Sequence, residues 1–327
     1  MQSLTNKVKA YVLDHNLEER SVAIACSGGL DSMVLLQALS EIYKPEKIFV
    51  LHCDHAWHEG STQISKSLGD YCKGRAFNYI SVKFDFTDLK KNEENARELR
   101  FQFFIQKAAE LGVRDLFMGH HLDDNVETIL FRLFRGTGVA GLKGIPLENL
   151  LESSGLTLHR PFLRCEKKEL QEYARDFNLT IWEDPSNALD FYSRNRIRLN
   201  IFPEAEKINP KFKNNVNRLA LLLEEQETYI NIQVESAVKQ LGSLPWNLEF
   251  FRGLEKLMQR RLLERFFTTN IDFQNDFLEA IQKGGFHRIN FSKDRFFTIK
   301  QKKIYLEITA DFQRMHKGVF PNEQVQG

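Results

Sequence analysis

Two kinds of hydrophobic pattern alternate through the first half of the chain. Short apolar runs, which are typical of buried strands, lie near residues 21–26, 47–53, 79–84 and 114–118. Longer helix-like runs lie near residues 31–42, 60–74, 94–111 and 123–134. This order predicts an α/β domain, a parallel sheet with helices on both faces. The functional site of such a sheet is expected at the carboxyl ends of its strands.

The pattern changes in the second half. A further helix is predicted near 166–178, long helical runs near 212–240 and 252–268, and strands with polar turns over 288–309. Two prolines in IFPEAEKINP interrupt the pattern near residue 205. We therefore expect an α/β domain over residues 1–205 and a mainly helical domain over 206–327 that ends in short strands.

Composition narrows the class of protein. The chain has 327 residues, enough for about two domains, and its net charge of +1 means that any nucleic-acid surface must be local. Its four cysteines form no C-x-x-C pair, which argues against a zinc ribbon or an iron–sulfur site and fits a reducing compartment. We expect a cytoplasmic protein, or a stromal one if the gene is plastid, with an amphipathic N-terminal helix and no membrane span.

The segment SVAIACSGGLDS, residues 21–32, carries the most specific signal. An apolar strand runs directly into SGGLDS, and an apolar helix follows. Glycines in such a strand-to-helix turn let backbone N–H groups approach a phosphate, and the helix N-terminus adds partial positive charge. A tight turn alone would also need glycine, but the loop in addition offers a carboxylate, Asp31, that could hold the Mg²⁺ of a nucleotide.

At these residues the chain resembles the PP-loop ATP pyrophosphatases, whose SGGxDS loop binds the pyrophosphate leaving group of ATP. The resemblance implies an adenine nucleotide alpha hydrolase-like fold, with ATP and Mg²⁺ as cofactors. It also implies that six residues of the loop bind the nucleotide: Ser27, Gly28, Gly29, Leu30, Asp31 and Ser32.

The segment GHHLDDNVET, residues 119–128, is the second strong signal. It follows a strand and opens a helix, so two histidines and two carboxylates crowd one strand end. An Asp N-cap with acidic residues in the first turn would explain one carboxylate. The crowding favours a site in which His120 orients or neutralises phosphates and Asp124 positions Mg²⁺ or acts as a base.

The order of SGGLDS, HCDH at 52–55, ARELR at 96–100, GHHLDDNVET and RGTGVAGLKGIP at 135–146 resembles the tRNA(Ile)-lysidine synthetases. The resemblance covers about residues 20–200. It implies ATP-dependent ligation of free lysine to C2 of the wobble cytidine of isoleucine tRNA with a CAU anticodon, through an adenylated tRNA. It further implies that residues 1–205 form a PP-loop ATP-binding catalytic domain and that residues 206–327 form a tRNA-binding domain, in a possible homodimer. The catalytic positions carried over by motif are Asp31, Arg97, Arg100, His120 and Asp124, and the adenosine pocket is expected at Cys53.

Other features are less decisive. RGTGVAGLKGIP is too rich in glycine for a helix, and is either a flexible connection or a loop that closes over substrates. Trp182 and residues 184–187 could border the lysine or cytidine pocket.

Two segments of the chain are locally basic. Residues 191–218 hold seven Lys or Arg against two acidic residues, and residues 283–303 hold seven against one. Such segments are often solvated faces, but they are also what local contact with tRNA would require.

Two alternatives stay open on the sequence. A PP-loop tRNA 2-thiolase would also adenylate a base carbonyl, but it typically depends on paired cysteines or a cluster. A non-catalytic nucleotide- or RNA-binding module would not need Asp31, His120 and Asp124 together. Pyrophosphate release from ATP that depends on tRNA and lysine would indicate lysidine formation. Dependence on a sulfur donor would indicate the thiolase, and ATP binding without turnover would indicate the module.

Overall fold

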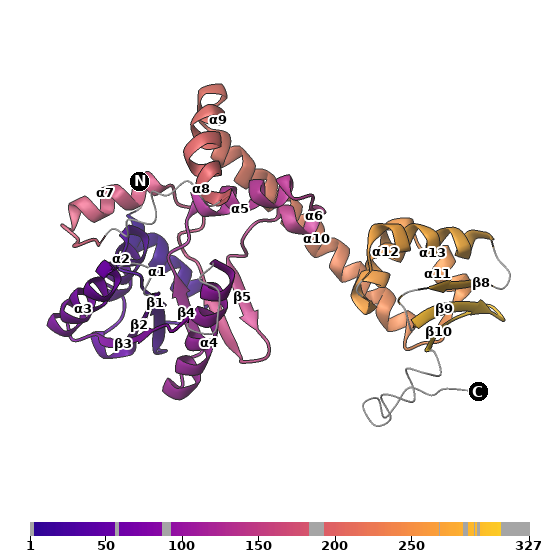
Figure 1. The fold of residues 1–327 in the computed structure, drawn as a ribbon, viewed down its shortest axis with the longest axis horizontal. Helices are drawn as coiled ribbons and strands as arrows, with labels where there is room; N and C mark the ends of the chain where they lie inside the picture. The colour runs from indigo at the N-terminus through magenta and orange to yellow at the C-terminus, as the bar shows by residue number, and fades with distance from the viewer. Residues whose placement is uncertain are drawn as a thin grey trace. The chain divides into compact units, whose positions relative to one another are not determined.

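The computed structural model describes residues 3–55, 59–86, 93–182, 193–267, 269–283, 287–290, 292 and 295–308. The chain forms two compact units, Met1–Glu224 and Glu225–Gly327 (Figure 1). The helix α10 (Phe212–Leu241) begins in the first unit and ends in the second. The functional division at residue 205 stays a prediction, because compactness does not show where a catalytic domain ends.

A six-stranded sheet forms the centre of the first unit. Its strand order is β3-β2-β1-β4-β6-β5, and every neighbouring pair is parallel except the antiparallel pair β5 and β6. The strands are β1 (Val22–Ala25), β2 (Ile48–Asp54), β3 (Asn78–Lys83), β4 (Asp115–Met118), β5 (Glu148–Leu151) and β6 (Leu156–His159). The four predicted strands and the α/β class are confirmed. The β5–β6 hairpin was not predicted, because neither strand is a continuous apolar run: β5 reads ENLL and β6 reads LTLH.

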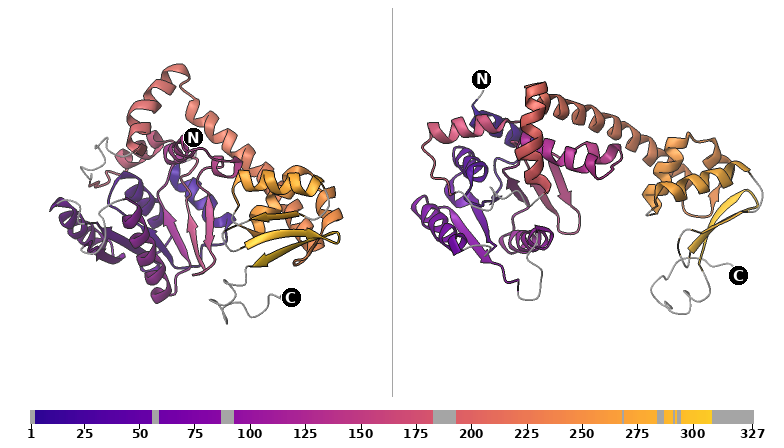
Figure 2. Two further views of the ribbon diagram at one scale, coloured as in Figure 1. Left: turned by 45° about the vertical axis from the view of Figure 1, so that its right-hand side comes forward. Right: turned by 45° about the horizontal axis from the view of Figure 1, so that its top comes forward.

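Helices cover both faces of this sheet, as Figures 1 and 2 show. One face packs against α1, α2, α3 and α7, and the other packs against α4. The helical elements of the unit are α1 (Leu4–Asp14), α2 (Leu30–Ser40), η1 (Pro45–Lys47), α3 (Glu59–Gly74), α4 (Glu93–Leu111), α5 (Leu122–Phe134), α6 (Val139–Leu142), α7 (Lys167–Asp176), α8 (Ser193–Arg196), η3 (Ile197–Ile201) and α9 (Phe202–Ile208).

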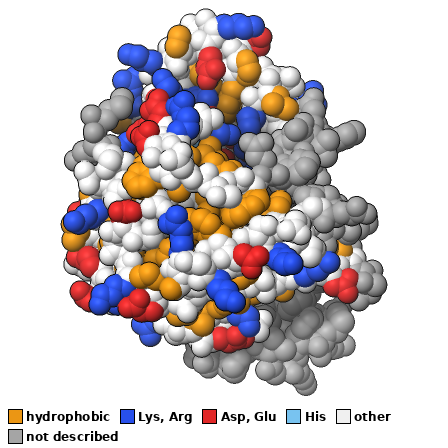
Figure 3. Space-filling view, turned by 90° about the vertical axis from the view of Figure 1, so that its left-hand side faces the viewer, with side chains coloured by type: hydrophobic (Ala, Val, Ile, Leu, Met, Phe, Trp, Pro, Cys, Tyr) orange, Lys and Arg blue, Asp and Glu red, His pale blue; other side chains and the backbone are white. Residues whose placement is uncertain are grey.

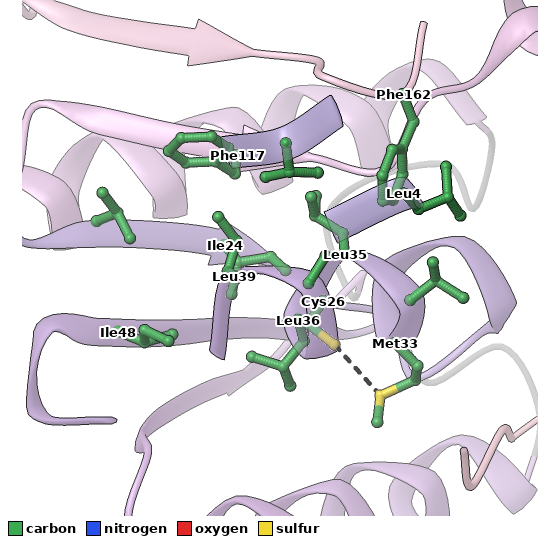
Figure 4. Close-up of a cluster of buried hydrophobic side chains, with 14 of the residues drawn as sticks. Leu4, Ile24, Cys26, Met33, Leu35, Leu36, Leu39, Ile48, Phe117 and Phe162 are labelled. Carbon is green, nitrogen blue, oxygen red and sulfur yellow. Dashed lines mark hydrogen bonds between the residues drawn. The ribbon is translucent and has the colours of Figure 1, made fainter. Parts of the chain in front are cut away.

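The helix α2 is the most deeply buried element near the glycine loop. Leu35, Leu36 and Leu39 are fully buried and pack toward Ile24 of β1, and the Cys26 thiol lies 3.8 Å from the Met33 sulfur (Figure 4). Burying each leucine contributes about 1.5–3 kcal/mol. The start of α2, and with it the loop at residues 27–31, is therefore held firmly on the sheet.

The second unit combines helices with a four-stranded sheet of order β7-β10-β9-β8, whose paired strands are antiparallel. Trp246, Phe251, Phe277 and Phe297 are fully buried in its core. The elements are β7 (Trp246–Asn247), α11 (Leu248–Gly253), α12 (Lys256–Phe266), α13 (Ile271–Lys283), β8 (His287–Asn290), β9 (Arg295–Lys300) and β10 (Lys303–Ile308). The predicted helical region and the terminal strands are confirmed.

The surface matches the near-neutral composition. On the face shown in Figure 3, basic, acidic and hydrophobic side chains are interspersed, and neither sign of charge dominates. In the parts of the chain that the structure describes, no helix is long and apolar enough to cross a membrane.

Candidate active site

The loop Ser27–Ser32 joins β1 to α2 and contains the N-terminus of that helix. Gly29 caps α2 with extended backbone and no side-chain cap, while the Ser32 hydroxyl donates to the Gly29 carbonyl at 3.0 Å. The Gly29 N–H donates to the Ser27 hydroxyl at 3.3 Å. The first N–H groups of a helix have no intrahelical acceptor. The loop is thus shaped to offer N–H groups, including that of Leu30, to an anion.

Gly28 is fixed by its backbone and by its neighbours. Its φ of +87° is a conformation that side chains rarely adopt, and a Cβ there would lie 3.3 Å from both Ile64 and Trp182. The Trp182 N–H donates to the Gly28 carbonyl at 3.0 Å. Trp182 therefore supports the glycine loop, whereas residues 184–187, grouped with it on sequence, lie outside the described residues.

The segment GHHLDD begins α5, and its cap is a histidine. The ring Nδ1 of His121 accepts from the Asp123 N–H at 3.2 Å, and the His121 N–H donates to Asp124 Oδ2 at 3.0 Å. An Asp N-cap, the simpler interpretation of this segment, is wrong, because both aspartates lie in the first turn. Since His121 Nδ1 is an acceptor, the neutral ring carries its proton on Nε2.

His121 Nε2 lies between the two motifs. It is 3.6 Å from Asp31 Oδ1 and 3.6 Å from Asp124 Oδ2. Burial lowers the pKa of His121, but the carboxylates of Asp31, Asp124 and Asp123 outweigh it, and the pKa is raised. The Asp31 Oδ1 atom is buried and has no hydrogen-bond partner among the described residues. Its contact with His121 Nε2 at 3.6 Å is too long for a hydrogen bond, so a bound cation would satisfy this oxygen.

His120 lies among cations. Burial lowers its pKa to about 4, and although Asp124 opposes this shift, Arg160, Arg100 and Arg97 add to it. The His120 ring is therefore neutral at pH 7. Both arginines of ARELR act on this ring, so the structure brings Arg97 and Arg100 to the same side as His120.

Arg160 is a member of this group that the sequence did not reveal. It is 6% exposed and donates to the Pro146 carbonyl at 2.7 Å. Burial and the neighbouring Arg97 lower its pKa to about 10. It follows β6, part of the hairpin that the hydrophobic pattern missed, so no local signal marked it.

Cys53 lies near the end of β2 and is half-buried. Burial raises the pKa of its thiol to about 12, while Arg100 opposes that shift. A thiol with such a pKa is a poor nucleophile at neutral pH. That the backbone at Cys53 borders the adenosine of ATP stays a prediction.

A buried ion-pair network extends along α5 from Asp124. Glu127 is 3% exposed, and its Oε2 lies 2.6 Å from Arg198 Nη2, which is also 3.5 Å from Asp124 Oδ1. Burial raises the pKa of Glu127 although Arg198 lowers it. Asp124 and Glu127 are three residues apart and share one helix face, so their spacing was the signal that could have identified Glu127.

The first turn of α5 is also tied to α10. Lys213 Nζ lies 2.5 Å from Asp123 Oδ2, and Asn125 Nδ2 donates to Asn217 Oδ1 at 2.9 Å. Asp123 is thus neutralised by a lysine, which leaves Asp31 and Asp124 as the carboxylates nearest His121.

The glycine-rich segment 135–146 is anchored on α5. Asn125 Oδ1 accepts from the Ile145 N–H at 2.7 Å, and Arg132 Nη1 donates to the Gly144 carbonyl at 2.7 Å. The expectation of no helix here is wrong over Val139–Leu142, where the single short helix α6 forms despite Gly141. Closure of this segment over substrates stays a prediction.

The carboxylates at this site suit a Mg²⁺ ion held by few protein ligands rather than a metal ion fully enclosed by protein side chains. In the described part of the chain, no group of three or more His, Cys, Asp or Glu side chains could hold a metal ion. Protein-bound Mg²⁺ commonly takes one or two carboxylates and completes its shell with water and substrate phosphates. The Asp31 Oδ1 atom beside the glycine loop, which has no hydrogen-bond partner among the described residues, suits that arrangement.

This fold and glycine loop define a protein of the PP-loop class. A family model described as "PP-loop domain" matches residues 2–205. The tRNA(Ile)-lysidine synthase of Petrotoga mobilis is 30% identical over 304 residues, covering 89% of this chain and 94% of the relative. That of Prochlorococcus marinus is 31% identical over 235 residues, covering 68% and 69%. The chain belongs to the tRNA(Ile)-lysidine synthase family.

A solved structure supports the fold alone. The U34-tRNA thiolase NcsA from Methanococcus maripaludis superposes with a TM-score of 0.56 at 20% identity, covering 68% of this chain and 78% of the thiolase. At that identity the likeness extends to the α/β architecture and not to the chemistry.

Proposed function

We propose that the protein uses ATP to ligate free lysine to C2 of the wobble cytidine of isoleucine tRNA with a CAU anticodon. One observation carries the proposal. The glycine loop and the start of α5 meet at the carboxyl edge of the sheet, where His121 Nε2 lies 3.6 Å from both Asp31 and Asp124. The family membership selects this reaction among those that PP-loop proteins perform.

The reaction has two steps in this proposal. The C2 oxygen of the cytidine attacks the α-phosphorus of ATP, an O–P bond forms, and pyrophosphate leaves. The ε-amine of lysine then attacks C2, the C2–O bond breaks, AMP leaves, and the amine loses a proton. The C2 oxygen is a poor leaving group until it carries the nucleotide, which explains the need for ATP.

The residues of the site are assigned to the first of these steps, the attack on ATP. The N–H groups of the loop bind the leaving pyrophosphate, and Arg97 and Arg100 stabilise the negative charge of the phosphates. Asp31 holds Mg²⁺, which when bound neutralises phosphate charge. His120, neutral at pH 7, accepts or donates a hydrogen bond without adding a charge of its own. Asp124, whose Oδ2 lies 3.6 Å from His121 Nε2, would position Mg²⁺ or act as a base in this first step.

The thiolase alternative is disfavoured by the state of the cysteines. All four are free, and burial raises the pKa of Cys165 to about 11 and of Cys53 and Cys72 to about 12. Burial also raises the pKa of Cys26. Sulfur transfer needs a thiolate, and these environments favour the thiol. Dimer formation and the cellular compartment stay predictions.

Release of pyrophosphate from ATP tests the proposal. The full chain should release pyrophosphate in amounts that match AMP only when both isoleucine tRNA (CAU) and lysine are present for multiple turnovers. Release that requires a sulfur donor instead would indicate the thiolase. Binding of ATP without turnover under every condition would indicate a non-catalytic module.

A further inference from the structure

The first unit contains a pocket that none of the assigned roles uses. Its volume is about 300 Å³, at the low end of small-molecule sites. Its lining comes from the last turns of α5 and from the segment formed by α8 and η3, and it includes Phe131, Phe134, Arg135, Arg196 and Asn200. Ile197 and Ile201 complete the lining, and we name these seven residues the α5 pocket.

The α5 pocket combines apolar and basic side chains. Two phenylalanines, two isoleucines, two arginines and one asparagine line it, and none of these described residues is acidic. Phe134 is 61% exposed, so its ring is available to a ligand, while Arg135 lies over the Phe131 ring at 5.3 Å. Single-stranded nucleic acid is bound by aromatic faces that stack on bases and by arginines that meet phosphates.

The α5 pocket also adjoins the candidate active site. Phe131 follows Asp124 by seven residues on the same helix, a rise of about 10 Å. Arg194 connects the two places, because its guanidinium lies 5.6 Å from the centre of the Phe131 ring and its Nε lies 3.8 Å from Glu127 Oε1. A ligand in the pocket would therefore lie on the same side of α5 as Asp124, about two helical turns away.

We propose that the α5 pocket holds one unstacked base of the tRNA anticodon loop, beside the nucleotide that reacts. The base stacks on Phe134, the amide of Asn200 meets its edge, and Arg135 and Arg196 meet the flanking phosphates. The inference rests on the proposed function for the identity of the RNA. The positive lining favours this occupant over a second copy of the chain, whose surface carries both signs of charge.

The test uses the full chain and an anticodon stem-loop RNA that carries 2-aminopurine at each unpaired position in turn. Fluorescence titration gives the affinity and shows which base changes its stacking. Phe134→Ala should weaken binding about 5- to 150-fold, the range for losing one stacked base. Phe134→Tyr should restore it. Arg196→Gln should reduce the slope of log affinity against log salt by about one.

Leu133→Ala is the matched control, because Leu133 is 51% exposed on the same helix and does not line the pocket. It should bind RNA like the wild type. Thermal unfolding, with and without Mg²⁺–ATP, verifies that all variants are folded.

The outcomes separate this inference from the proposed function. If Phe134→Ala binds RNA as tightly as Leu133→Ala does, the pocket inference is wrong even where lysidine is formed. If Phe134→Ala loses RNA affinity while the wild type forms no lysidine, the pocket stands and the proposed function falls. If Phe134→Ala only converts a dimer to a monomer in sedimentation, the pocket is a contact between copies and the inference is overturned.

Discussion

Gly119 and Asp31 are in backbone contact. A Cβ at Gly119 would lie 2.9 Å from both the carbonyl carbon and the carbonyl oxygen of Asp31, closer than real Cβ contacts. This contact brings the end of β4 against the start of α2. The absence of a side chain at residue 119 is therefore what lets the two motifs share one site.

Gly119→Ala should separate the two motifs. The added methyl group meets backbone rather than a movable side chain, so the start of α2 or of α5 must shift. A misplacement of about 1 Å can reduce turnover about 10²-fold. Steady-state lysidine formation measures the effect. Gly74→Ala is the control, because a Cβ there meets nothing within 4 Å; equal activity of the two variants would contradict the importance of the contact.

Asp31→Asn should reduce turnover about 10²-fold or more, the scale for losing one preorganised electrostatic contact. The change is nearly isosteric, so the thermal unfolding midpoint should hardly move. The dependence of the rate on Mg²⁺ concentration should shift to higher concentration. Asp70→Asn, at an exposed position on α3, is the matched control. Unchanged Mg²⁺ dependence in Asp31→Asn would remove this carboxylate from the nucleotide site.

His120→Gln should make the protein less sensitive to acid. The pKa of His120 is about 4 when folded, against about 6.5 in the unfolded chain. Between these values the unfolded state binds more protons, so this residue lowers wild-type stability as the pH falls from about 6.5 to 4. Urea unfolding at pH 7 and pH 4.5 should show a smaller loss for His120→Gln. Parallel losses in both proteins would show that His120 is not held neutral.

Arg198→Met should destabilise the protein by about 2 kcal/mol or more, because it leaves the buried Glu127 carboxylate with weaker compensation. Adding Glu127→Gln to that variant should recover part of the loss. Urea unfolding of both single variants and the double variant gives the coupling. Arg265→Met, which breaks the exposed pair with Glu235, should cost at most about 1 kcal/mol. Additive losses would mean that Arg198 and Glu127 do not act as a pair.

The sequence was most informative where contacts are local. Short apolar runs located β1 to β4 because a longer helical run follows each strand along the chain. The motifs at Asp31 and Asp124 could be placed together because parallel strands end at one edge of the sheet. The helix face of ARELR brought both Arg97 and Arg100 to bear on His120, although neither could be chosen over the other by spacing.

Long-range contacts carried no such signal. Arg160 and Lys213 reach the site from elements 40 and 90 residues away from His120 and Asp123, respectively. Nothing in the local pattern around either residue indicates its partner. The identity of the α5 cap was missed for a different reason, because histidine is not among the residues that usually cap helices, and only the geometry shows His121 in that role.

Nucleoside analysis of the tRNA tests the central claim most directly. Isoleucine tRNA with a CAU anticodon is incubated with the full chain, Mg²⁺–ATP and isotopically labelled lysine, then digested and separated by mass. We predict a labelled cytidine derivative at the wobble position, formed only with ATP, and absent with ornithine or arginine in place of lysine. A tRNA whose wobble cytidine stays unlabelled under all these conditions, while ATP is bound, would contradict the account.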